Sequence, residues 1–225
     1  MTVQLHLGDC LEFIRGLQDG CVDAVVSDPP YGMDWDTNTT RFSGGKRVVS
    51  RGKDWGVGIV GDDKPFDPAP WGAFKNVILW GYNHWATKVP TGTLLVWVKR
   101  NDAAFGSFLS DAEVAWMKGG CGVYCFRDVP NINDRGKHPT QKTVELMRWC
   151  IERVTDIGDT VFDPFMGSGT TGVAAVQLGR NFIGCEIDPT YYAIAERRIR
   201  EAEEQPPLFV LDTPRAQQLT LEEAQ

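Results

Sequence analysis

The chain has 225 residues, of which 42% are hydrophobic and 24% charged, a balance typical of folded globular proteins. It is long enough for one domain with a well-buried core. No apolar run approaches the ~20 residues that cross a bilayer, and the N-terminus lacks the features of a signal peptide, so we expect a cytoplasmic protein without membrane contact. Its six cysteines are then expected as reduced thiols. No metal site is expected, because Cys121, Cys125 and His138 lack a fourth ligand for zinc.

The net charge of -7 argues against a nucleic-acid partner, but the charges are unevenly distributed. Residues 201–225 hold six acidic residues and one basic residue. In contrast, thirteen consecutive residues contain five bases and no acid, namely Arg41, Lys46, Arg47, Arg51 and Lys53. This run is either a solvated loop or a loop that contacts DNA phosphates, and both interpretations stay open.

In chain order, the first half predicts a β-α-β opening followed by a long loop. Residues 3–7 alternate as a strand, residues 10–17 have helical spacing with Asp9 as the N-cap, and residues 22–27 predict a buried strand. Residues 32–70 show loop chemistry without a sustained period. Residues 71–85 predict a helix and a short strand, and residues 93–98 a buried strand that ends in polar residues. Two further strands, over 112–116 and 122–126, are expected to be antiparallel.

The second half predicts alternating helices and strands. A basic connection over 127–142 precedes a helix over 143–154, a strand over 160–165 and a glycine-rich turn over 166–172. A helix over 173–178 and a strand over 181–188 follow, and Pro189 opens a helix that continues to residue 200. We expect one domain over residues 1–204 and a flexible acidic tail over 205–225.

The sequence Asp28-Pro29-Pro30-Tyr31 follows a predicted buried strand. Proline has no N–H and fixes its own φ, so the strand stops abruptly and its end is held rigidly. Ligands of open α/β sheets bind at the carboxyl ends of the strands. A carboxylate beside an aromatic ring suits a planar substrate that bears an N–H. A turn with a helix cap and an ordinary surface tyrosine is the alternative.

Residues 160–188 form a strand, a Gly-x-Gly turn, a helix and a strand that ends in an acid, a unit typical of nucleotide binding. Glu186 lies nineteen residues after Gly167, where a carboxylate can accept both ribose hydroxyls. Asp163, ahead of the glycines, would repel a pyrophosphate and attract an amino or sulfonium cation. S-Adenosylmethionine fits these features, because it has a ribose and cationic groups but no phosphate. A dinucleotide is the alternative.

Taken together, four motifs in order resemble the β group of DNA amino-methyltransferases, in which the catalytic motif precedes the cofactor motif. They are Gly8-Asp9-Cys10, DPPY at 28–31, HPTQK at 138–142 and DPFMGSGTT at 163–171. The resemblance covers about residues 3–200. It implies an α/β, Rossmann-like methyltransferase fold with a mostly parallel seven-stranded sheet and a reversed edge strand. It also implies S-adenosylmethionine as cofactor and duplex DNA as substrate.

The resemblance further implies roles for individual residues. The catalytic residues would be Asp28, Pro29, Pro30 and Tyr31. The cofactor would contact Asp9 and Cys10 at the adenine, Glu186 and Ile187 at the ribose, Thr140, Gln141 and Lys142 at its amino-acid end, and Asp28, Asp163, Pro164, Phe165, Gly167, Ser168, Gly169, Thr170 and Thr171 around the methionine part. DNA would contact the loops over 32–70 and 117–137, through Arg41, Lys46, Arg47, Arg51, Lys53, Arg135 and Lys137.

The motifs also restrict the chemistry. Methylation of a cytosine ring carbon needs a thiolate nucleophile, and the chain contains no Pro-Cys pair, whereas methylation of an exocyclic amine needs no nucleophilic residue. We expect Asp28 and the Pro29 carbonyl to hold the amine, and Tyr31 to stack on a flipped base. In the family, the aspartate form of DPPY favours N6 of adenine. The alternatives are N4 of cytosine, an amine of RNA, and a non-catalytic DNA-binding module that retains the fold.

The chain departs from the family pattern in two places. Thr143 stands where the family usually has a proline, which affects the start of the following helix. A large target-recognition insert is also missing. We therefore expect a short DNA recognition sequence, relaxed specificity, or specificity supplied by a second subunit, as in a homodimer. The resemblance implies a bacterial or phage-encoded enzyme of a restriction-modification system, with a cognate restriction endonuclease as a further partner.

Overall fold

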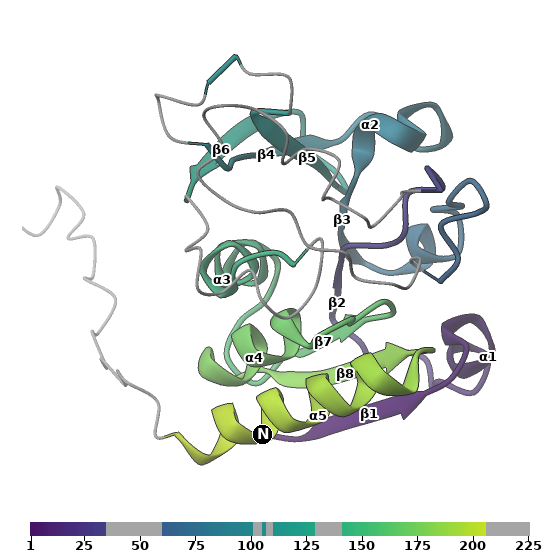
Figure 1. Cartoon of the computed structure of the whole chain (residues 1–225), viewed down its shortest axis with the longest axis vertical. Helices are drawn as coiled ribbons and strands as arrows, with labels where there is room; N and C mark the ends of the chain where they lie inside the picture. The colour runs from purple at the N-terminus through teal and green to yellow at the C-terminus, as the bar shows by residue number, and fades with distance from the viewer. Residues whose placement is uncertain (35–59, 101–104, 107–109, 129–140, 206–225) are drawn as a thin grey trace, which may run out of the picture.

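The computed structural model describes residues 1–34, 60–100, 105–106, 110–128 and 141–205 (Figure 1). Its centre is one sheet in the order β1-β8-β7-β2-β3-β5-β4-β6. The strands are β1 (Val3–Leu7), β2 (Ala24–Ser27), β3 (Asn76–Trp80), β4 (Thr93–Val98), β5 (Ala112–Met117), β6 (Val123–Arg127), β7 (Thr160–Asp163) and β8 (Asn181–Glu186). The predicted α/β, Rossmann-like architecture is confirmed.

Two details of the sheet differ from the sequence-based expectation. Within the described residues the sheet has eight strands, and the reversed strand β5 lies between β3 and β4 instead of at an edge. After β4, the chain returns as β5 and pairs Ala112 with Val98. Residues 118–122 then step past the start of β4, so that β6 adds to its other side in parallel. β5 and β6 therefore run in opposite directions but are separated by β4.

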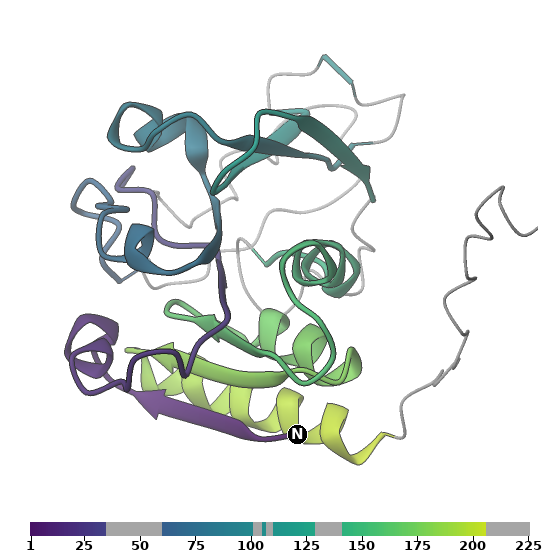
Figure 2. The same ribbon diagram turned by 180° about the vertical axis from the view of Figure 1, so that it is seen from behind.

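Helices cover both faces of the sheet (Figures 1 and 2). One face carries α3 (Val144–Val154), α4 (Thr170–Gln177) and α5 (Pro189–Glu204), and the other carries α1 (Cys10–Ile14), α2 (Tyr82–Trp85) and two short 3-10 helices, η2 (Trp71–Ala73) and η3 (Ala86–Lys88). Side chains alternate between the faces along each strand. In β2, Val26 packs under α3 and α4, whereas Val25 joins the opposite core cluster.

Side-chain caps set the starts of three helices. Asp9 caps α1 as predicted, accepting from the backbone N–H of Leu11 at 2.7 Å, and Asp188 caps α5 in the same manner. Thr143 caps α3, because its hydroxyl accepts from the Leu146 N–H at 3.2 Å. The residue that departs from the family pattern therefore begins this helix with an ordinary N-cap.

The parallel strands all end at one edge of the sheet. The carboxyl ends of β2, β3, β4, β7 and β8 lie there, and the reversed β5 brings its first residues to the same edge, because Glu113 pairs with Trp97 near the end of β4. Polar residues that follow or begin these strands are thereby collected in one place. In the described parts of the chain, no helix has the length and apolar character needed to span a membrane.

Candidate active site

The two principal motifs begin on neighbouring strands. β2 pairs directly with β7, and the Ser27 hydroxyl donates to Asp163 Oδ1 at 2.5 Å across the ends of these strands. Asp28 is the next residue after Ser27, and the glycine-rich turn follows Asp163. The DPPY motif and the DPFMGSGTT motif, 135 residues apart in the sequence, thus share one edge of the sheet.

The Asp28 carboxylate is held by two donors. The Tyr31 hydroxyl donates to Oδ1 at 2.5 Å, and the Lys142 ammonium donates to Oδ2 at 2.6 Å. The Asp28 side chain is 20% exposed and that of Lys142 only 4%. Burial raises the pKa of Asp28, and the nearby Lys142 charge partly opposes this rise. Each carboxylate oxygen has a further lone pair, so Asp28 can still accept from an incoming N–H.

Two charged residues at this site were missed by sequence reasoning. Glu113, at the start of β5, forms an ion pair with Lys142 through Oε2 at 2.8 Å, and Lys99 donates to its Oε1 at 2.5 Å. Burial would raise the pKa of Glu113, but the two lysines outweigh it and lower the pKa to about 2. Two sequence signals could have identified them: Glu113 is an acid within a predicted apolar strand, and Lys99 directly follows another predicted strand.

The Tyr31 ring packs closely against His84 and Gly81 at the end of β3. It stacks on His84 of α2, with ring centroids 4.9 Å apart and planes inclined by 14°. Gly81 lies beneath it with φ of +83°, and a Cβ there would come within 2.1 Å of Tyr31 Cε1. Beyond the motif, the Gly32 N–H donates to Asp62 Oδ1 at 2.8 Å. These contacts fix the ring beside the Asp28 carboxylate.

Glu186 closes the glycine-rich turn. Its Oε2 accepts from the Gly167 N–H at 2.9 Å, and its Oε1 accepts from the Asp188 N–H at 2.8 Å. Burial raises the pKa of Glu186, and these backbone donors partly oppose the rise. Each oxygen keeps a second lone pair, so the carboxylate can accept the two hydroxyls of a ribose.

Two of the motif residues, Asp163 and Gln141, have a charge or an unpaired polar atom that fits S-adenosylmethionine. Asp163 is 3% exposed, and burial raises its pKa to about 6 although Ser27, Thr171 and the Phe165 N–H donate to it. Within the described residues no cation pairs with Asp163, so a cationic ligand would offset its burial. Gln141 Oε1 is also buried without a hydrogen-bond partner in the described chain and can accept from an ammonium group.

Other motif residues have roles in packing. The hydroxyls of Ser168 and Thr170 accept from Arg198 Nη1 on α5, at 2.9 and 3.2 Å. Gly169 permits α4 to approach α5, because a Cβ there would lie 2.9 Å from the Ala195 Cα. Cys10 is buried, and burial raises the pKa of its thiol to about 12, so it stays neutral.

The remaining expected site residues are distributed as follows. Pro164 is buried, Phe165 packs against Trp71, and Ile187 is half exposed. Thr140 and all the expected DNA-binding residues lie outside the described part of the chain, namely Arg41, Lys46, Arg47, Arg51, Lys53, Arg135 and Lys137. Within the described residues, no group of three or more histidine, cysteine or acidic side chains could hold a metal ion.

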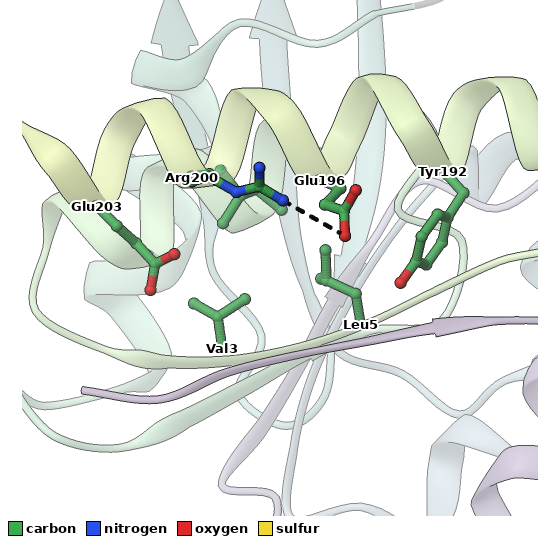
Figure 3. Close-up of a pocket in the computed structure, with 7 residues that line it drawn as sticks. Val3, Leu5, Tyr192, Glu196, Arg200 and Glu203 are labelled. Carbon is green, nitrogen blue, oxygen red and sulfur yellow. Dashed lines mark ion pairs between the residues drawn. The ribbon is translucent and has the colours of Figure 1, made fainter.

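A groove of about 270 Å³ lies between β1 and α5, away from these residues (Figure 3). Val3 and Leu5 form its floor, and the ion pair between Glu196 and Arg200, at 3.6 Å, lies along α5. β1 is an edge strand, three positions from β2 in the sheet. The groove is therefore remote from Asp28 and forms no part of the candidate active site.

Comparisons with known proteins find similarity to DNA methyltransferases. Residues 116–197 match a family model described as DNA methylase. The type II methyltransferase M2.MboI of Moraxella bovis is 26% identical over 243 aligned positions, which cover 88% of this chain and 87% of that protein. M2.DpnII of Streptococcus pneumoniae is 53% identical over 68 residues, a match that covers 30% of this chain and 25% of the relative's length.

The fold also matches solved structures. The crystal structure of the M1.HpyAVI complex with SAM aligns with a TM-score of 0.61 and 24% identity, over 88% of this chain and 99% of that one. The sheet with helices on both faces has a Rossmann-like α/β fold, which this solved structure shares. The resemblance of this chain to the DNA amino-methyltransferases, first indicated by its four motifs, is confirmed.

Replacement of Glu186 by glutamine is expected to weaken S-adenosylmethionine binding by about 10- to 100-fold. The neutral amide accepts through one oxygen only, and hydrogen bonds to a charged group contribute about 1.5–3 kcal/mol. Isothermal titration calorimetry with the cofactor measures the effect. Glu196→Gln, on the exposed face of α5, is the matched control and should bind as the wild type does. Equal affinities for both variants would remove Glu186 from the cofactor site.

Proposed function

We propose that this protein transfers a methyl group from S-adenosylmethionine to the exocyclic N6 amine of adenine in duplex DNA. The observation that carries this proposal is the contact between Ser27 and Asp163, which brings the DPPY motif beside the glycine-rich turn. A cofactor held by Glu186 and Asp163 then lies next to a base held by Asp28 and Tyr31.

Bound S-adenosylmethionine supplies an electrophilic methyl group on a sulfonium. The protein's task is to present the amine to it. The lone pair of an aromatic amine is delocalised into its ring, and acceptors for its N–H groups favour a tetrahedral nitrogen aimed at the methyl carbon. Asp28 and the Pro29 carbonyl are the proposed acceptors. The new N–C bond forms as the C–S bond breaks, and the nitrogen then releases one proton through Asp28 to solvent.

The flipped base needs a surface that replaces its stacking in the duplex. The Tyr31 ring, backed by His84 and seated on Gly81, offers such a surface next to the Asp28 carboxylate. Stacking there would offset part of the unstacking cost of a few kcal/mol. The loops over 32–70 and 117–137 are the proposed DNA contacts.

The DNA substrate is supported by the match to a DNA methylase model and by relatives named type II methyltransferases. The choice of adenine is supported by the aspartate of DPPY. We further propose that the enzyme acts in the host cytoplasm within a restriction-modification system, together with a cognate endonuclease. Direct reading of modified positions in host DNA after expression would identify the target sequence.

The proposed activity is tested with purified protein, tritiated S-adenosylmethionine and unmethylated duplex DNA at low salt. We expect label in the DNA and N6-methyladenine after digestion to nucleosides. N4-Methylcytosine as the only product would contradict the choice of adenine but keep the chemistry. Transfer to RNA alone would contradict the DNA substrate, and no transfer to either would contradict the activity.

A further inference from the structure

Four charged side chains form a continuous chain at the active edge of the sheet. Lys99 follows β4, Glu113 begins β5, Lys142 precedes the N-cap of α3, and Asp28 follows β2. The links are Lys99 Nζ to Glu113 Oε1 at 2.5 Å, Glu113 Oε2 to Lys142 Nζ at 2.8 Å, and Lys142 Nζ to Asp28 Oδ2 at 2.6 Å. Two cations alternate with two anions, so these four linked side chains carry no net charge together.

Lys142 is the most enclosed member of this chain. Its side chain is 4% exposed, compared with 20% for Asp28, 25% for Glu113 and 27% for Lys99. Its ammonium also lies 3.3 Å from the Tyr31 hydroxyl and 5.8 Å from the centre of the Trp80 ring. A buried ammonium persists only when anions pair with it, and here two carboxylates do so. The ammonium therefore donates to two residues of the DPPY motif, Asp28 and Tyr31, and is held from the other side by Glu113.

We propose that Lys142, held in place by Glu113 and Lys99, is a positioning residue that keeps the Asp28 carboxylate ionised and correctly oriented for the target amine. This assignment rests on the proposed methyl transfer. It differs from the role that the family resemblance implies for Lys142, which is contact with the amino-acid end of the cofactor. A protonated Asp28 would lose an acceptor and present an O–H to the N–H groups of the base.

The electrostatics of the site agree with this geometry. Burial alone would lower the pKa of Lys142, but Asp28 and Glu113 outweigh it and raise the pKa well above its usual value. Burial raises the pKa of Asp28; Lys142 opposes the rise and Glu113 adds to it. Among the residues that the structure describes, the other titratable groups that face Asp28 are Tyr31, which donates to it, and Asp163, whose own pKa the Asp28 charge helps to raise.

Lys142 and Glu113 act on the pKa of Asp28 in opposite directions, so removing each should shift it in opposite directions. Lys142→Met removes the cation, so the pKa of Asp28 should rise, and the acidic limb of the kcat profile should move to higher pH by about one unit or more. Glu113→Gln removes an anion of nearly the same shape, so the limb should move to lower pH. A residue with only a structural role would not produce shifts of opposite sign in the two variants.

The experiment measures kcat between pH 5 and 9 and cofactor affinity by calorimetry for the wild type and each variant. We expect Lys142→Met to lower kcat on the order of 100-fold at pH 7, a typical loss for a preorganised polar group, with cofactor affinity within about twofold. Glu113→Gln should lower kcat less. Lys75→Met, an exposed residue before β3 at the opposite edge of the sheet, is the matched control and should behave as the wild type does.

Carbon-13 NMR of the Asp28 carboxyl provides a readout that does not need activity. Its titration should move upward in Lys142→Met and downward in Glu113→Gln. If the wild type is active but neither variant shifts the Asp28 titration or the acidic limb of kcat, the role assigned to Lys142 is overturned while the proposed methyl transfer stands. If the wild type transfers no methyl group but the Asp28 titration shifts as expected in the two variants, the result would contradict the methyl transfer and support the charge coupling. If Lys142→Met does not fold, the direction of the shift in Glu113→Gln decides.

Discussion

Replacement of Asp28 by alanine is expected to lower kcat by about 10³-fold and to leave the affinity for S-adenosylmethionine within about twofold. Asp28 is the proposed acceptor for the target amine, and loss of one preorganised electrostatic group at a reacting centre costs about 10²–10³ in kcat. Cofactor affinity should persist, because Glu186 and Asp163 lie on other strands. Single-turnover transfer of tritiated methyl groups and calorimetry measure the two quantities.

Two controls separate chemistry from folding. Asp19→Ala, an exposed aspartate in the turn before β2, should retain wild-type kinetics. Asp28→Asn keeps the shape of the side chain but removes its charge, and should lose nearly as much activity as Asp28→Ala. Lys142 keeps Glu113 as a partner in both variants, so circular dichroism should show a folded protein. Equal losses of cofactor affinity and turnover would move Asp28 out of the catalytic role.

Replacement of Gly81 by alanine is expected to lower kcat by about 100-fold through displacement of Tyr31. The new Cβ would lie 2.1 Å from Tyr31 Cε1, well inside van der Waals contact, so we expect the ring to move from its place beside Asp28. A misplacement of about 1 Å near reacting atoms can cost 10²-fold in rate. The fluorescence of 2-aminopurine at the target base reports whether the base still leaves the duplex and stacks.

Gly20 supplies the matched control for Gly81. Its φ of +77° is close to the +83° of Gly81, but a Cβ at Gly20 would meet nothing within 4 Å. Gly20→Ala therefore carries the same backbone strain, roughly 1–2 kcal/mol, without the clash. We expect it to lower the melting temperature and leave kcat unchanged. A similar kcat in Gly81→Ala and Gly20→Ala would show that methyl transfer does not depend on the packing of Tyr31 against Gly81.

Local features of the sequence predicted most of the secondary structure. Apolar runs, the glycine turn, the capping acid Asp9 and the helix-opening Pro189 are short-range signals, and the elements predicted in residues 160–200 are present. The place of β5 could not be predicted in this way. Strand order depends on pairing between distant segments, and β5 has the same apolar character whether it pairs with β6 or lies between β3 and β4.

The candidate site was predicted only in part for the same reason. Asp28 directly follows one apolar strand and Asp163 ends another, so their gathering at one edge could be expected. Glu113 could not, because it reaches that edge only through the reversal of β5, which pairs it with Trp97. The position of Lys142 beside Asp28 depends on how α3 packs against the sheet. Such long-range placement is not encoded in the spacing of a motif.

The order of strands has a consequence for the synthesis of this protein. β2 is made early but acquires its neighbour β7 only after residue 163 has left the ribosome, and β1 must wait for β8. Contacts between segments so distant in sequence slow folding, because loop closure must precede the pairing. The nascent chain therefore carries unpaired strand edges until its last quarter emerges, and the contact between Ser27 and Asp163 cannot form before residue 163 has been made.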